Sequence, residues 1–131
     1  MRSLVFSFLL LLTPTFAQAD TFRETVPANK TSVVGAHATY GPLCEGGTIP
    51  KMKVTQAPKN GSVSFRQVSS KLSEKAGRCA GKTVKGTLVV YKPNRGFRGE
   101  DVFRVRFVMD MHTYGTAKIR NVSNKYVIEV K

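Results

Sequence analysis

The chain has no tryptophan, two histidines and eight acidic residues among its 131. Few residues are therefore available to serve as the acid–base groups or metal ligands that most enzymes use. The sequence contains no H-E-x-x-H pattern, no nucleophile elbow and no phosphate-binding glycine loop. Glu100 and Asp101 are adjacent, but neighbours in a strand point to opposite faces and do not form an acid–base pair. We therefore expect no enzymatic activity and no cofactor.

Long apolar runs are also missing. The longest, residues 4–12, is shorter than the roughly 20 residues of a membrane span. Arg2 precedes it, and Ala17-Gln18-Ala19 follows with the small-x-small pattern of signal-peptidase sites. This order predicts a signal peptide over residues 1–19 and export to the periplasm or the extracellular space; a buried N-terminal helix is the alternative. The remaining residues, 20–131, suffice for a single domain.

Cysteine is limited to Cys44 and Cys79. In an exported protein an even cysteine count favours a disulfide, and closing this loop stabilises the fold by about 4 kcal/mol on the chain-entropy model. The alternative is a metal or redox pair. No C-x-x-C spacing or nearby ligand set supports that alternative.

Negative charge is scarce while positive charge is abundant. Lys and Arg number 21, which gives a net charge of +13. Arg2 is the only charged residue before Asp20, so the exported part would keep +12. A field of this size favours anionic partners such as nucleic acid, anionic glycans or lipid headgroups. The alternative is a charge that only keeps the protein soluble.

Helix signals are nearly absent after residue 19, and short runs of Val, Phe, Tyr and Thr alternate with turn residues. The predicted strands cover residues 31–40, 51–56, 61–67, 86–91, 101–109 and 117–131, the last as one strand or two. Asn60-Gly61 predicts a tight hairpin with positive φ angles. Residues 68–85 are predicted to be an inserted loop with a helical turn at 71–76, tied down by the disulfide. The pattern predicts an all-β protein, an antiparallel sandwich of about seven strands.

The stretch from Phe103 to Phe107 alternates apolar and charged side chains. Alternate residues of a strand share a face, so Phe103, Val105 and Phe107 are expected in the core. Arg104 and Arg106 must then face outward, because burying an unpaired guanidinium is prohibitively costly.

Two segments, APKNGSVSF and VVYKPNRGFRGEDVFRVRFVMD, resemble the immunoglobulin-like, cadherin-like domains of bacterial secreted and surface proteins. The residues that match the family's motifs are Pro58, Gly61, Tyr91, Pro93, Gly96, Phe97, Gly99, Asp101 and Phe103. The resemblance covers about residues 33–131 and implies an immunoglobulin-like sandwich. Because all of these positions belong to the scaffold, the motif indicates a fold and not a chemistry.

Each motif residue has an expected role. Pro93 presets φ for a turn, and Gly96 and Gly99 allow left-handed backbone. Asp101 is expected to accept backbone N–H bonds from that same loop, while Tyr91 and Phe97 cap the core.

The chain also departs from the family. Its members often occur as tandem repeats in large, acidic, calcium-associated adhesins, whereas this chain is basic and its carboxylates are dispersed. A calcium site built from oxygen ligands is therefore not expected, and the adhesin role does not transfer simply.

The leading functional hypothesis is a basic binding surface. It comprises Arg95, Arg98, Arg104, Arg106, Lys118 and Arg120. Guanidinium groups match phosphate, sulfate and carboxylate, and the shortage of exposed aromatics favours an envelope glycan or lipid headgroup over nucleic acid. Three alternatives stay open: a charged strand edge that only prevents aggregation, a protein-interaction or assembly subunit, and a copper site at Met111 and His112.

Overall fold

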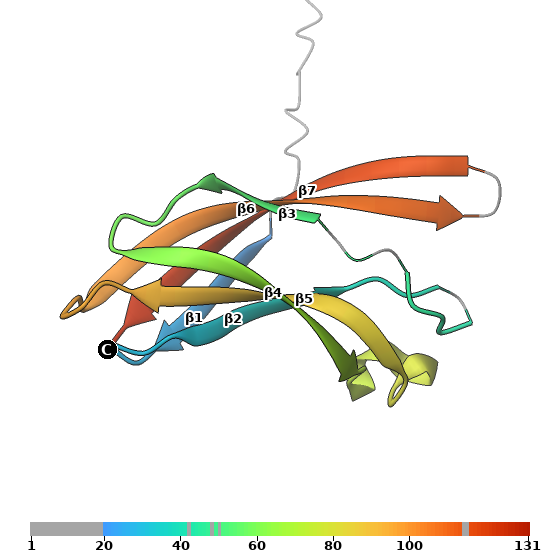
Figure 1. Ribbon diagram of the computed structural model, residues 1–131, viewed down its shortest axis with the longest axis horizontal. Helices are drawn as coiled ribbons and strands as arrows, with labels where there is room; N and C mark the ends of the chain where they lie inside the picture. The colour runs from blue at the N-terminus through green and yellow to red at the C-terminus, as the bar shows by residue number, and fades with distance from the viewer. Residues whose placement is uncertain (1–19, 42, 48, 50, 114–115) are drawn as a thin grey trace, which may run out of the picture.

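The computed structural model describes residues 20–41, 43–47, 49, 51–113 and 116–131, with the side chains of 108–120 excepted. The predicted signal peptide lies outside this part. The described chain forms seven strands and one short 3₁₀ helix, in two sheets that face each other (Figure 1). The elements are β1 (Thr21–Val26), β2 (Ser32–Ala38), β3 (Lys51–Gln56), β4 (Gly61–Lys71), η1 (Glu74–Cys79), β5 (Thr83–Pro93), β6 (Gly99–Thr113) and β7 (Thr116–Val130). The all-β class is confirmed.

The strand order is β1-β7-β6-β3 in the larger sheet and β2-β5-β4 in the smaller one. β1 pairs with β7 in parallel, while the other pairs are antiparallel. The sequence-based prediction missed β1 and this parallel pair. The reason is physical: of the six β1 residues only Val26 is buried, so the strand lacks a clear apolar alternation. It is held by pairing with β7, about a hundred residues later in the chain.

Residues 68–85 form less of a loop than predicted. β4 continues to Lys71 and β5 begins at Thr83, with Ser69 paired to Lys85. The helical turn is the 3₁₀ helix Glu74–Cys79 and not residues 71–76. Within the described residues no helix is long and apolar enough to cross a membrane.

The Cys44–Cys79 disulfide is formed, with 5.3 Å between the two Cα atoms. It joins the β2–β3 connection to the buried end of η1. The bond therefore ties the segment that leaves the smaller sheet after β2 to the β4–β5 hairpin of that same sheet.

The predicted alternation in β6 is confirmed. Phe103, Val105 and Phe107 are buried, whereas Arg106 is exposed and Arg104 is half-buried. Phe103 stacks on Tyr126 with ring centroids 4.8 Å apart, and Tyr126 stacks on Phe22 at 5.3 Å. These three residues are direct cross-strand partners in β6, β7 and β1.

Asp101 accepts hydrogen bonds from several elements although its side chain is buried. The donors are the backbone N–H groups of Lys59, Asn60 and Val102 and the hydroxyl of Tyr91, at 2.8 to 3.1 Å. The expectation that these N–H groups come from the Pro93–Gly99 loop is wrong, because Lys59 and Asn60 belong to the β3–β4 turn. Burial, together with the bond to Asp101, raises the pKa of Tyr91, so its hydroxyl keeps the proton that it donates.

The hairpin prediction at Asn60-Gly61 is also wrong, because β3 and β4 belong to different sheets and neither residue has a positive φ. Gly61 is required by packing: a Cβ there would lie 2.6 Å from the ring of Tyr91. Gly96 and Gly99 do have positive φ angles, +79° and +128°, as predicted. Pro93 is the last residue of β5 and is buried, so the turn begins after it.

Replacing Asp101 with Asn should destabilise the protein by about 3 kcal/mol, because an amide cannot accept all four donors and leaves buried N–H groups unpaired. Urea unfolding measures this loss. The neighbouring exposed acid provides the matched control, and Glu100→Gln should change the free energy of unfolding by less than about 0.5 kcal/mol. Equal effects of the two changes would contradict the role given to Asp101.

Candidate functional site

The structure describes the side chains of four of the six residues in the predicted basic surface, and these four lie in two places. Arg104 and Arg106 lie on the outer face of the larger sheet, in β6. Arg95 and Arg98 lie in the β5–β6 turn, where the Gly96 N–H bonds to Asn29 of the β1–β2 turn. Arg104 lies five positions after Gly99 along the extended strand, about 17 Å away. Arg95 and Arg98 therefore lie in the turn before β6, apart from Arg104 and Arg106 farther along the strand.

Lys118 and Arg120 lie where side chains are outside the described part of the structure. The backbone register pairs Lys118 with Met111 and Arg120 with Met109. In contrast, Arg104 pairs with Lys125 and Arg106 with Ser123.

The outer face of the larger sheet carries more positive charge than the sequence-based surface included. Arg104 lies directly opposite Lys125 of β7, and Arg106 directly opposite Lys53 of β3. Cross-strand partners have Cβ atoms about 5 Å apart. We call the set Lys53, Arg104, Arg106 and Lys125 the cationic face. Lys51 of β3 and Arg23 of β1 lie on the same side of the sheet. Their register partners are Val108 and Val127, which lie two residues from Arg106 and Lys125 along the same strands.

The cationic face contains two like-charged cross-strand pairs, which normally destabilise a sheet. No carboxylate among the described side chains forms an ion pair with any of its four members; the ion pair that is present joins Lys131 to Glu129, with Nζ and Oε1 3.8 Å apart. Glu129 lies opposite Glu100 at the far end of β6 and β7. The Nε of Arg104 donates instead to Oε1 of Gln56 at 3.2 Å, which orients the guanidinium without neutralising it.

Two members of this face were missed from the sequence. Lys125 could have been found, because it precedes the buried alternation Tyr126, Ile128 and Val130 and must point outward. Lys53 could not, since its position opposite Arg106 depends on a pairing between residues about fifty positions apart.

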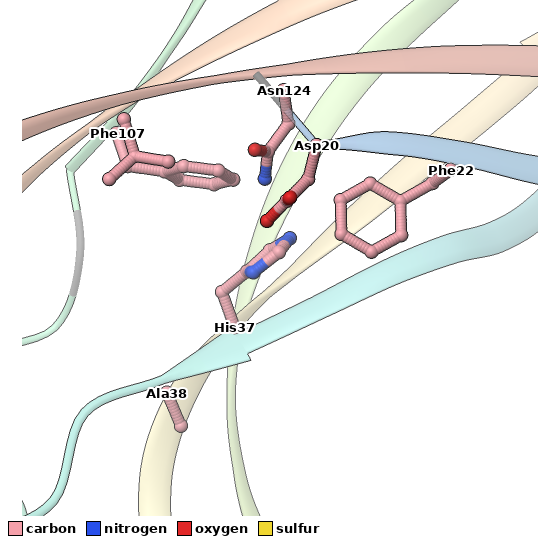
Figure 2. Close-up of a pocket in the computed structure, with 7 residues that line it drawn as sticks. Asp20, Phe22, His37, Ala38, Phe107 and Asn124 are labelled. Atoms are coloured by element: carbon pink, nitrogen blue, oxygen red, sulfur yellow. The ribbon is translucent and has the colours of Figure 1, made fainter. Parts of the chain in front are cut away.

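A second feature lies between the two sheets, near the start of β1 (Figure 2). It is a cavity of about 190 Å³, lined by Asp20, Phe22, His37, Ala38, Phe107, Val122 and Asn124. The carboxylate of Asp20 and the side chain of Asn124 point toward the His37 ring in Figure 2, between the two phenylalanines. We call this space the end cavity.

Three polar side chains at the end cavity are linked. The Tyr126 hydroxyl lies 2.8 Å from Nε2 of His37, and the Asn124 amide favours the ionised form of the same hydroxyl. Gly35 gives the hydroxyl room, because a Cβ there would lie 2.8 Å from its oxygen. Burial raises the pKa of Tyr126 to about 12, while the bond from Asn124 acts in the opposite direction. Burial lowers the pKa of His37, so its imidazole is neutral near pH 7.

No metal centre emerges from the described part of the chain, which contains no group of three His, Cys, Asp or Glu residues able to hold an ion. The predicted copper ligands Met111 and His112 have side chains outside the described residues. The copper hypothesis therefore stays a prediction.

No protein-family model matches this chain, nor does any curated protein or solved structure.

The lowered pKa of His37 predicts acid sensitivity. The folded state favours the neutral ring, so its contribution to stability is complete above pH 6.5 and is lost as the pH falls toward the folded-state pKa. The free energy of unfolding should fall between pH 7 and pH 5, and it should fall less in His37→Gln. Urea unfolding at several pH values measures both slopes. The same change at His112 is the control, and a flattening seen there instead would contradict the assignment.

Proposed function

We propose that this protein is an exported, non-enzymatic binding module that engages a polyanionic component of the cell envelope through the cationic face. The ligand class is a surface or polymer with repeated phosphate, sulfate or carboxylate groups, such as an anionic glycan or lipid headgroups. The net charge of +13 supports long-range attraction to such a partner.

The observation that carries this proposal is the presence of two like-charged register pairs without an ion-pair partner among the described side chains, Arg104 with Lys125 and Arg106 with Lys53. Each pair costs stability in the free protein, and a bound anion removes that cost by lying between the two charges. Four cations on three adjacent strands also present a regular array, which suits a repeating anion.

The uncharged outer residues favour a glycan or a lipid over nucleic acid. The next register pair along β6 and β7 is Val102 with the buried Val127, and neither side chain offers a ring on which a base could stack. Salt-dependent charge contacts are therefore the main attraction in this proposal.

The same proposal includes export of the protein and an immunoglobulin-like fold. The signal-peptide pattern of residues 1–19 and the disulfide support an oxidising compartment. The Tyr91–Phe103 motif, together with two facing sheets, supports an immunoglobulin-like fold.

A protein-interaction role is a second candidate, supported by the loop that the disulfide holds. Leu43 is 80% exposed and Tyr40 is 40% exposed, both within four residues of Cys44. Size-exclusion chromatography of native envelope extracts separates the two roles, because only this one requires a stable protein partner.

The double variant Arg104→Ser/Arg106→Ser should bind heparin and anionic lipid vesicles about tenfold more weakly at low salt. Two exposed charge contacts contribute together about 1.4 kcal/mol. Salt elution from a heparin column and flotation with phosphatidylglycerol vesicles measure the loss and distinguish a polymer from a membrane. Wild-type retention should fall steeply as salt rises.

The matched control is Arg95→Ser/Arg98→Ser, which removes the same charge at the turn end of the molecule. It should weaken binding by less than about twofold if the contact is local. Equal losses in the two double variants would show that net charge alone governs retention, and retention independent of salt would defeat the proposal.

A further inference from the structure

β4 is a long edge strand with a neighbour on one side. It has 11 residues and pairs with β5 alone, because the strand order in the smaller sheet is β2-β5-β4. Its register with β5 is regular from Gly61 to Lys71. The edge strands β2 and β3 each contain a register shift, and β1 has six residues. Short edge strands and bulges prevent a further strand from pairing, so among the four edge strands β4 is the one suited to accept one.

The pairing with β5 shows which backbone groups of β4 point to its open side. The Asn94 N–H donates to the Asn60 carbonyl, so these two residues are a hydrogen-bonded pair in the same register. Such pairs alternate along an antiparallel ladder. The even-numbered residues of β4 therefore bond to β5, while Val63, Phe65 and Gln67 direct their N–H and C=O groups away from it. No described residue forms a backbone hydrogen bond with these three groups on that side.

The inner face of β4 has apolar surface that an added strand would cover. Val63 lies directly opposite Tyr91 and Phe65 directly opposite Val89, and both β4 residues pack against the core. Tyr91 and Val89 are 0% exposed, whereas Val63 and Phe65 are half-buried. Side chains on directly opposite positions of neighbouring strands contact each other. An added strand with apolar residues at these positions would therefore complete the burial of Val63 and Phe65.

The charge at this edge indicates the chemistry of the partner. β4 and β5 together contain four cations, Arg66, Lys71, Lys85 and Lys92, and no carboxylate. Arg66 is exposed on the outer face, and no described carboxylate forms an ion pair with it. A second copy of this chain would bring the same cations to the same edge, where like charges repel. A strand with acidic residues on its outer face has the matching charge.

We propose that the open edge of β4 binds an extended acidic segment of another protein as an added antiparallel strand. Apolar residues of the segment lie opposite Val63, Phe65 and Gln67 and exchange backbone hydrogen bonds with them. The acidic residues between these positions point to the outer face, where one of them lies opposite Arg66. This edge belongs to the smaller sheet and the cationic face to the larger one, so the proposal does not depend on the envelope ligand.

Short synthetic peptides test the proposal on the purified protein. The probe is a capped seven-residue peptide of alternating valine and glutamate, with valine at both ends, and calorimetric titration measures its affinity. Replacing the glutamates with lysines should weaken binding at least about tenfold, because the peptide then repels the cationic edge. A peptide of the same composition with the valines grouped at one end should also bind at least about tenfold more weakly, since its valines no longer share one face.

N-methylation of the peptide tests the strand pairing itself. In an antiparallel pair the valines opposite Val63, Phe65 and Gln67 direct their N–H groups at β4, while the N–H groups of the glutamates point away. Methylating the valine nitrogens should therefore abolish binding, whereas methylating the glutamate nitrogens should change the affinity by less than about threefold. The unmodified peptide should also slow hydrogen exchange at the N–H groups of Val63, Phe65 and Gln67.

Two substitutions at one position locate the edge. Gln67→Pro removes an N–H group that β5 does not use, and proline is tolerated in edge strands when its nitrogen faces outward. It should weaken binding of the peptide at least about tenfold, whereas Gln67→Ala should change the affinity by less than about twofold. Arg104→Ser/Arg106→Ser alters the other sheet and should also have an effect below about twofold. If Gln67→Pro does not fold, the methylated peptides still decide.

Several results would overturn the proposal. Equal binding of the alternating and the grouped peptides would show attraction by net charge alone. Binding that survives methylation of the valines would exclude the antiparallel pairing. A loss in Arg104→Ser/Arg106→Ser as large as that in Gln67→Pro would place the peptide on the cationic face. A dimer of the free protein that Gln67→Pro dissociates, seen by size-exclusion chromatography, would show that a second copy occupies the edge.

Discussion

One buried carboxylate connects the parts of this fold that are far apart in the chain. Asp101, in β6, accepts from the β3–β4 turn, from Tyr91 of β5 and from its own neighbour Val102. β5 and β6 belong to different sheets, so the bond to Tyr91 crosses the core. A buried charge is stable only when several donors surround it. The β3–β4 turn and the distance between the two sheets must therefore both bring their donors within hydrogen-bond distance of the Asp101 carboxylate.

From Asp101, aromatic rings lead through the core to the opposite end. Tyr91 stacks on Phe103, Phe103 on Tyr126, and Tyr126 on Phe22, with centroid distances of 6.0, 4.8 and 5.3 Å. Both tyrosines are fully buried, and each uses its hydroxyl at one end of this column, Tyr91 toward Asp101 and Tyr126 toward His37. The first end is fully paired. The second ends beside Asn124, whose buried Oδ1 receives no hydrogen bond from any described residue.

The sequence predicted the parts of the fold that depend on local pattern. The bounds of β3, the alternation in β6 and the positive φ angles at Gly96 and Gly99 follow from neighbouring residues, and the structure confirms them. The parallel strand β1 was missed because its partner lies at the other end of the chain. Gly61 was explained wrongly for the same reason: its constraint is the ring of Tyr91, thirty residues away, and not its own backbone angle.

The candidate sites likewise contain residues that local pattern predicts and residues that it does not predict, for a physical reason. Strand alternation decides whether a side chain faces in or out, so Arg104 and Arg106 could be assigned from sequence. Register decides what stands beside a side chain, and Lys53 and Lys125 reach these arginines only through pairings between distant strands. Hydrophobic burial on the inner face fixes that register, because a slip by one residue would move Phe103 and Tyr126 out of the core. The like-charged pairs on the outer face are thus imposed by the packing of the inner one.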